Sequence, residues 1–202
     1  MTHLLTLDNV SKIFGGIRAL SNVSLSVPPD RIVGVIGPNG AGKTTLFNVI
    51  TGAYRATEGN VVFDGKDMTQ WPSHRIMRAG IARTFQNIRL FGSMTVWEHL
   101  LVAQPHQGNM LRLVLPARFA DPVAWRRAEE ALDIFGLGAY RDTVARTLSY
   151  GLQRKVEMAR ALTTGPKLLM LDEPVAGMNH DEAEELRLLL LQLQGQGLSI
   201  LL

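Results

Sequence analysis

The chain has 202 residues, of which 46% are hydrophobic and 19% charged, a balance typical of globular proteins with a sizeable core. It contains no cysteine, which excludes disulfides and thiolate metal sites, and no run of 18 apolar residues, so the sequence predicts no membrane-spanning helix. The formal net charge is +3, but Lys and Arg are scattered without a run of three, so direct binding of nucleic acid is not favoured.

The N-terminal part is predicted to contain antiparallel strands. Residues 4–7 and 20–27 are expected to be strands on either side of a turn at 15–16. A second turn leads into 31–36, a β-branched run that we expect to be a buried strand. Residues 61–65 end in Asp-Gly and predict a hairpin, because these two residues tolerate the positive φ values of a two-residue turn.

The next segment fits the phosphate-binding pattern GxxxxGK[ST]. Its members are Gly37, Pro38, Asn39, Gly40, Ala41, Gly42, Lys43, Thr44 and Thr45. A predicted strand precedes it and a predicted helix follows, as this motif requires. Glycines let consecutive backbone N–H groups surround phosphate oxygens, and a helix N-terminus adds partial positive charge. Lys43 is expected to reach the β- and γ-phosphates and Thr44 to ligate Mg²⁺, so the sequence predicts binding of a nucleoside triphosphate.

From Thr95 onward, apolar residues recur at three- and four-residue spacing and predict helices. The poorly periodic stretch 105–122 has two interpretations, a helical excursion packed on its own lobe or a surface that docks on a partner. None of the five histidines lies at metal-ligand spacing, and we interpret each as a surface or loop residue. They are His3, His74, His99, His106 and His180.

Near the C-terminus, the apolar run 167–171 predicts a central parallel strand that ends at Asp172 and Glu173. Open α/β sheets place ligands at this end of their strands. Asp172 suits contact with Mg²⁺ or its waters, and Glu173 suits a general base that polarises the attacking water. Asn179 is expected to cap a leucine-rich core helix. Residues 198–202 begin another strand, and we expect that the chain is truncated there.

Residues 148–154, which include Ser149 and Gly151, resemble the signature motif of ABC-type ATPases. Taken alone, Ser149 before a helix is an N-cap. Gly151 precedes Asp172 by 21 residues, which matches the order and approximate spacing of the family. The resemblance covers essentially the whole chain. It implies a P-loop NTPase of ABC type, with a mixed-sheet α/β core, an N-terminal antiparallel β part and a helical lobe at roughly 87–160, inserted in a single domain of 1–202.

Further residues resemble functional elements of this family. Phe14 matches the aromatic that stacks on adenine, although alone it is equally compatible with a core aromatic. Gln86 matches the glutamine that links Mg²⁺ and water to the helical lobe, although alone it is a plain polar loop residue. Residues 175–179 match the loop that crosses the dimer interface. The resemblance implies that Glu173 and Gln86 are catalytic and that Ser149 and Gly151 contact the γ-phosphate held by a second protomer.

A subfamily is also indicated. Residues 14–20, 80–91 and 94–100 are similar to the ATP-binding subunit of branched-chain amino acid importers, a group that also includes relatives assigned to urea and amides. The resemblance implies an ATPase with ATP and Mg²⁺ as cofactors, the metal being held by Thr44, Gln86 and Asp172. It also implies a second ATP-binding subunit, membrane permease subunits and, indirectly, a solute-binding protein as partners, at the cytoplasmic face of the inner (plasma) membrane.

Three positions depart from the family pattern. Leu152 replaces the glutamine after the signature glycine, and His180 stands where the family often has proline. The family's switch histidine follows a later strand, and the chain ends at Leu202 before reaching it. Two alternatives therefore stay open beside a transport ATPase: a truncated ATP-binding module with impaired hydrolysis, and a non-transport ABC ATPase acting on DNA or ribosomes.

Overall fold

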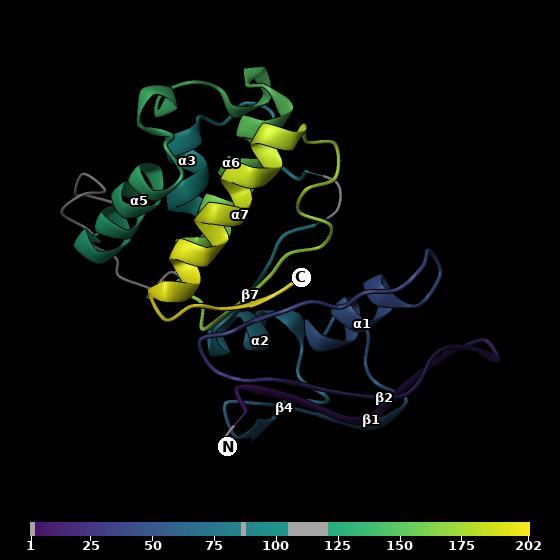
Figure 1. The fold of residues 1–202 in the computed structure, drawn as a ribbon. Coiled ribbons are helices and arrows are strands. Elements are labelled where there is room, and N and C mark those ends of the chain that lie inside the picture. Colours follow the sequence, from purple (N-terminus) through teal and green to yellow (C-terminus); the bar gives the residue numbers. More distant parts are fainter. Residues whose placement is uncertain (1–2, 86–87, 105–120) are drawn as a thin grey trace. The chain divides into compact units, whose positions relative to one another are not determined.

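The structure is a computed structural model that describes residues 3–85, 88–104 and 121–202. The chain forms two compact units (Figure 1). The first contains Met1–Arg83, Lys167–Asp172 and Leu190–Leu202, and the second contains Thr84–Pro166 and Glu173–Leu189.

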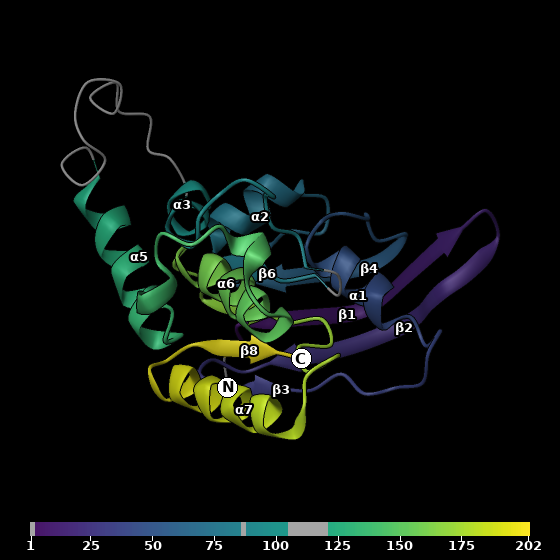
Figure 2. The same ribbon diagram turned by 90° about the horizontal axis from the view of Figure 1, so that it is seen from above.

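The strands lie in the first unit and form two four-stranded sheets (Figures 1 and 2). One sheet is antiparallel with the order β2-β1-β4-β5, and the other is parallel with the order β3-β8-β7-β6. The bounds are β1 Leu5–Phe14, β2 Ile17–Val27, β3 Ile32–Val33, β4 Glu58–Phe63, β5 Lys66–Asp67, β6 Ile81–Arg83, β7 Leu168–Met170 and β8 Ser199–Leu201.

Both predicted turns of the antiparallel sheet are confirmed. Gly15 and Gly16 join β1 to β2, with φ values of +49° and +90°. Asp64 and Gly65 join β4 to β5 in a two-residue turn, with φ values of +49° and +73°. Positive φ at both central positions matches the right-handed twist of the flanking strands, which explains why this dipeptide closes the hairpin.

The parallel sheet confirms one predicted strand and shortens another. β7 lies between β6 and β8, and all of its residues are buried, as a central parallel strand requires. The prediction of a buried strand over 31–36 is wrong in its extent, because β3 covers only Ile32–Val33, both half-buried, and Ile36 is 97% exposed. Among the described strands β3 lies at one edge of this sheet, so its β-branched side chains are covered less fully than those of a central strand.

Two of the described helices lie wholly in the first unit, α1 Lys43–Ile50 and α2 Ser73–Ala79. Helix α1 buries Leu46, Phe47, Val49 and Ile50 in a core shared with both sheets. That apolar face fixes the helix against the strands, so its N-terminus is held at one end of the core.

The second unit is helical. Its elements are α3 Val96–Val102, α5 Pro122–Ile134, the 3₁₀ turns η2 Gly138–Tyr140 and η3 Ala145–Thr147, and α6 Tyr150–Leu162. Helix α7 His180–Gly195 begins in this unit and ends in the first. The predicted cap of α7 is confirmed, because Asn179 Oδ1 accepts from Glu182 N at 2.9 Å and the Glu182 carboxylate accepts from Asn179 N at 3.0 Å. Helix α7 buries Leu186, Leu190 and Leu193 but exposes Leu188 and Leu191.

The interpretation of His99 as a surface residue is wrong. This histidine is fully buried in α3, where its Nδ1 lies 2.8 Å from Thr95 O and its Nε2 accepts from Phe91 N at 2.8 Å. Both ring nitrogens therefore have backbone partners, which is what permits a polar ring in a helical core. Most of the stretch 105–122, for which two interpretations were given, lies outside the described residues.

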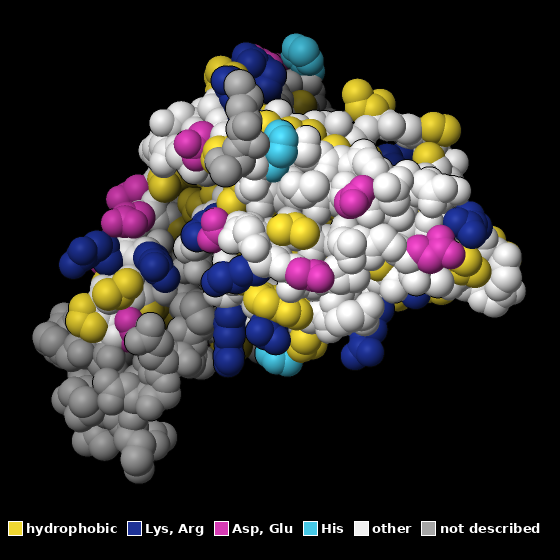
Figure 3. Space-filling view, turned by 90° about the horizontal axis from the view of Figure 1, so that it is seen from below, with side chains coloured by type: hydrophobic (Ala, Val, Ile, Leu, Met, Phe, Trp, Pro, Cys, Tyr) yellow, Lys and Arg dark blue, Asp and Glu magenta, His cyan; other side chains and the backbone are white. Residues whose placement is uncertain are grey.

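Charged side chains are dispersed on the face of the molecule that is drawn in Figure 3. The face drawn in Figure 3 carries Lys and Arg among acidic, apolar and uncharged side chains, which matches their scatter along the sequence. Within the described residues, no helix is long and apolar enough to span a bilayer.

Candidate functional site

The phosphate-loop segment ends in a backbone that only glycine adopts easily. Gly40 and Gly42 have φ values of +82° and +91°, and a Cβ on Gly42 would lie 2.7 Å from Ala19 O. Helix α1 begins directly after Gly42. Within the described part of the chain, no side chain caps this helix and its first turn holds no acidic residue. Its first N–H groups are therefore oriented toward a site that suits an anion.

Lys43 is folded back over the phosphate loop. Its Nζ donates to Gly37 O at 2.6 Å and to Pro38 O at 3.1 Å. The loop carbonyls thus hold the ammonium group above the loop, where a phosphate can replace them as the partner of the charge. This geometry is consistent with the predicted contact of Lys43 with the β- and γ-phosphates.

Asp172 is connected to helix α1 through Arg83. Its carboxylate pairs with Arg83 Nη2 at 2.9 Å, both side chains being less than 10% exposed, and Arg83 Nη1 donates to Asn48 Oδ1 at 2.6 Å. Asn48 lies four residues after Thr44, so the two share one face of α1. This link indicates that Asp172 lies on the side of α1 that carries Thr44, which is compatible with the prediction that both supply oxygen ligands.

The donors of this group fit Mg²⁺. The ion prefers oxygen ligands, and it is usually held by one or two carboxylates together with phosphates and water. Asp172 supplies a carboxylate and Thr44 a hydroxyl. The described residues contain no group of three or more His, Cys, Asp or Glu that could hold a metal ion. They therefore do not surround a metal with protein carboxylates alone.

Phe14 lies at the end of β1 and is 40% exposed, which does not fit the alternative of a core aromatic. Tyr54 packs against it in a T-shaped arrangement, with ring centroids 5.1 Å apart at 79°, and Lys12 Nζ lies 4.8 Å from the Phe14 ring. Phe14 is thus an aromatic surface, supported by a second ring, that suits stacking of a planar base.

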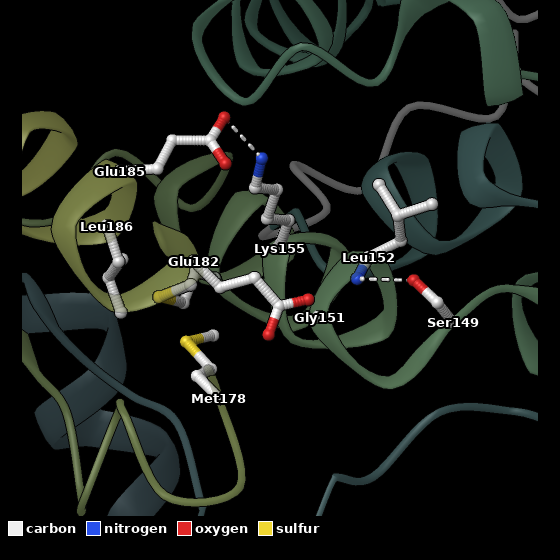
Figure 4. A pocket seen from close by; sticks show the side chains of 9 residues that line it. Ser149, Gly151, Leu152, Lys155, Met178, Glu182, Glu185 and Leu186 are labelled. Carbon is white, nitrogen blue, oxygen red and sulfur yellow. Dashed lines mark hydrogen bonds and ion pairs between the residues drawn. The ribbon is translucent and has the colours of Figure 1, made fainter. Parts of the chain in front are cut away.

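In the second unit, Ser149 and Gly151 lie at the N-terminus of α6. Ser149 Oγ accepts from Leu152 N at 3.5 Å, so the predicted N-cap is confirmed. A pocket of about 200 Å³ lies between α6 and α7 (Figure 4). Its lining includes Ser149, Gly151, Met178 and Glu182, and a Cβ on Gly151 would lie 2.7 Å from the Glu182 carboxylate. A larger residue at 151 would therefore require the flexible Glu182 side chain to move.

Glu173 follows Asp172 in a left-handed conformation, with φ +49°. Non-glycine residues adopt it only when their surroundings hold them there. The Glu173 carbonyl accepts from Arg154 Nη2 at 3.2 Å and from Ala176 N at 3.1 Å. Gln86, the other residue predicted to be catalytic, lies outside the described residues.

Sequence reasoning missed the partners that hold these residues, namely Tyr54, Arg83, Arg154 and Glu157. For the last two a signal existed. Arg154 and Glu157 are three residues apart on a helix face that also holds Met158 and Ala161, and two opposite charges on an apolar face predict a buried pair. Arg83 carries no comparable local signal, because its partners are 35 and 89 residues distant.

Comparison with known proteins gives consistent matches. The family model described as ABC transporter matches residues 20–176. The chain is 41% identical to the high-affinity branched-chain amino acid transport ATP-binding protein BraF of Pseudomonas aeruginosa, over 96% of this chain and 78% of that protein. It is 43% identical to the corresponding protein LivG of Escherichia coli, over 95% and 77%.

Solved structures agree. A crystal structure of the ADP conformation of an ATP-binding cassette of an ABC transporter is similar with a TM-score of 0.87 and 36% identity. The likeness covers 100% of this chain and 80% of that one. A nucleotide-free ATP-binding cassette from an ABC transporter is similar with a TM-score of 0.86 and 35% identity, over 99% and 80%.

Proposed function

The chain belongs to the ABC transporter family, and on that premise we propose that it is the ATP-binding subunit that powers an importer of branched-chain amino acids. The predicted fold class, a P-loop NTPase of ABC type, and the predicted ATPase activity are confirmed by this membership. Two observations support the mechanism: the hydrogen bonds that hold Lys43 over the phosphate loop, and the link from Asp172 through Arg83 to Asn48 on α1. We propose that both units form a single domain of 1–202, with roughly 87–160 as its helical lobe.

ATP binding is assigned to the phosphate loop and the exposed aromatic of the first unit. The backbone N–H groups of 37–45 and the α1 N-terminus surround the phosphates, Lys43 neutralises the β- and γ-phosphate charge, and Phe14 stacks on adenine. Thr44 and Asp172, together with Gln86, would hold Mg²⁺, which supplies charge neutralisation and orientation of the phosphate oxygens when bound.

Hydrolysis is assigned to Glu173 as the general base. Its carboxylate would accept a proton from the water that attacks the γ-phosphate in line, with Gln86 orienting that water. Most of the catalysis in such a transfer comes from positioning and charge stabilisation. A second ATP-binding subunit would contribute Ser149 and Gly151, whose helix N-terminus faces the γ-phosphate. Two chains would thus enclose two ATP molecules.

The transported solute is assigned from the relatives, whose names specify branched-chain amino acid transport. We place the chain at the cytoplasmic face of the inner (plasma) membrane, bound to permease subunits that cooperate with a solute-binding protein. Closure of the two ATP-binding subunits would reach the permease through the region of Gln86.

The catalytic assignment is tested by Mg·ATP turnover of the chain and of Glu173→Gln, with nucleotide binding measured in parallel. We expect the variant to bind ATP normally and to lose turnover at least about 100-fold, the magnitude typical of a lost general base. Glu184→Gln, an exposed carboxylate on α7, is the control and should match the parent. Equal turnover in Glu173→Gln and the parent would contradict the assignment.

The solute is tested by expressing the chain in a bacterium that lacks its own branched-chain amino acid ATP-binding subunit. Restored uptake of labelled leucine, absent with Lys43→Ala, would support the assignment. Restored uptake of urea or short amides without leucine uptake would contradict it and point to another branch of the same group.

A further inference from the structure

Helix α6 contains a buried ion pair between Arg154 and Glu157. Arg154 Nη1 lies 2.8 Å from Glu157 Oε2, and the side chains are 1% and 0% exposed. Transfer of two charges from water to a protein core is costly, and well-packed apolar side chains of similar volume often stabilise a fold equally well. Stability alone is thus a weak reason for a pair at this position, and its remaining contacts show what else it does.

The pair binds both backbone groups of one residue outside the helix. Arg154 Nη1 donates to Phe85 O at 2.5 Å, and Glu157 Oε1 accepts from Phe85 N at 3.4 Å. A neighbouring strand would satisfy the same two groups in a sheet. Phe85 directly precedes Gln86 in the sequence. The pair therefore fixes the backbone at the point where the chain enters the predicted glutamine loop.

The same guanidinium also binds the backbone of Glu173. Arg154 Nη2 donates to Glu173 O at 3.2 Å, and Glu173 is one of the five non-glycine residues with positive φ in the described chain. A strained conformation persists where the surroundings determine it. Because the guanidinium is planar and rigid, binding Phe85 O and Glu173 O with its two Nη atoms sets the spacing of these two backbones.

We propose that Arg154 and Glu157 are positioning residues for ATP hydrolysis. They hold the backbones of Phe85 and Glu173 in one geometry relative to each other, so that the Glu173 carboxylate extends from a fixed backbone. This inference rests on the proposed function, in which Glu173 is the general base. Neither residue is required to touch ATP, so their loss should affect the chemical step and spare nucleotide binding.

The test replaces the whole pair, Arg154→Met with Glu157→Met, because removal of one partner leaves a buried uncompensated charge that can unfold the chain. We expect kcat to fall 10- to 100-fold with KM and ATP affinity unchanged. Amide hydrogen exchange should become faster at Phe85 and at 173–176, while the core of α6 keeps its protection. Arg154→Lys, which retains the charge but not the fork of donors, should recover only part of kcat.

The matched control is Glu184→Ala with Arg187→Ala. It removes an Arg–Glu pair that has the same three-residue spacing and lies in the same unit. This pair is exposed, and its hydrogen bonds join only the two side chains, not the backbones of Phe85 and Glu173. This variant should keep the parent's kcat and exchange. Unchanged exchange at Phe85 and 173–176 in the double Met variant would overturn the inference, as would faster exchange with unchanged kcat.

Failure of this inference can be separated from failure of the proposed function. If Glu173→Gln abolishes turnover and the double Met variant does not lower it, only the positioning role is wrong. If Glu173→Gln leaves turnover intact, the general base assignment is wrong, and the positioning role for that base falls with it. The hydrogen exchange of the double Met variant still shows in that case whether the pair anchors both backbones.

Discussion

The phosphate loop of the first unit and the segment around Glu173 in the second are held in different ways. Lys43 is positioned by carbonyls five and six residues away, and the loop by glycines within the same motif. Glu173 and Phe85 are positioned by Arg154, which is 19 residues from one and 69 from the other. The first geometry is therefore encoded locally and the second through tertiary contacts, so mutations should affect them differently.

The largest expected effect on turnover and ATP affinity is that of a mutation in the phosphate loop. Lys43→Ala removes the only side-chain cation of the 37–45 motif, where phosphate charge is to be bound. We expect turnover to fall by at least about 100-fold and ATP affinity to fall with it, since charge stabilisation dominates phosphoryl transfer. Fluorescent-nucleotide titration and phosphate release measure the two quantities.

Lys66→Ala, on the exposed strand β5, is the control for charge removal and should change neither quantity. The unfolding midpoint of Lys43→Ala should equal that of the parent, because the hydrogen bonds given for the Lys43 ammonium group go to carbonyls of the exposed phosphate loop. A large loss of stability in Lys43→Ala would show that the loop depends on the lysine for its fold, which would contradict a locally encoded backbone.

The next effect concerns stability and a long-range contact of the first unit. Arg83→Met leaves the buried Asp172 carboxylate without its guanidinium, and loss of one partner of a buried pair costs about 3–5 kcal/mol. Urea denaturation measures this loss. Lys167→Met removes the cation of an exposed pair with Asp64 in the same unit and should leave the free energy of unfolding nearly unchanged.

An equal, small effect of Arg83→Met and Lys167→Met would mean that Asp172 does not depend on Arg83. The position of Asp172 would then not require a side chain distant in sequence. A large effect confined to Arg83→Met would show that Asp172, unlike the phosphate loop, depends on a partner 89 residues away.

These contrasts explain which features the sequence predicted. The phosphate loop, the Asp64-Gly65 hairpin and the Asn179 cap each depend on residues within a few positions. The hairpin and the cap are found as predicted, and the glycines at 40 and 42 have the positive φ values expected of such a loop. Strand β7 was predictable because its run of apolar residues has the length and composition of a central strand.

Features that depend on the tertiary surroundings of a segment were missed. Residues 31–36 have the composition of a buried strand, but the edge position of β3 is a property of the sheet and not of the segment. A histidine can be buried when both ring nitrogens have hydrogen-bond partners, as the backbone provides for His99. The sequence does not show these partners, so His99 was expected at the surface. The roles of Arg83 and Arg154 require acceptors far along the chain, which no local pattern reveals.

A smaller effect is expected at the adenine end of the first unit. Phe14→Ala removes the exposed ring and should weaken ATP binding about tenfold, since an aromatic contact contributes about 0.5–1.5 kcal/mol beyond burial. Tyr54→Ala should weaken binding less, because Tyr54 acts only by packing against Phe14. Phe14→Tyr should retain the parent's affinity. If Tyr54→Ala weakened binding more than Phe14→Ala, Tyr54 rather than Phe14 would be the stacking residue.

The smallest effect is a pH dependence of the second unit. Burial, assisted by the charge of Arg160, lowers the pKa of His99 below its ordinary value, while the hydrogen bond to Thr95 opposes this change. Folding therefore favours the neutral ring. The stabilisation is complete above the unfolded pKa of about 6.5 and is lost as the pH falls from there toward the folded pKa.

One such group changes the free energy of unfolding by at most about 1.4 kcal/mol per pH unit. Urea denaturation of the parent should give a lower free energy of unfolding at pH 5.5 than at pH 7.5. His99→Gln should be less stable than the parent at pH 7.5, and its free energy of unfolding should differ less between the two pH values. An unchanged difference in His99→Gln would assign the pH dependence to other groups. Both backbone partners of the His99 ring lie within eight residues of it. A smaller pH dependence in His99→Gln would therefore show that a contact between residues close in sequence contributes to the stability of the second unit.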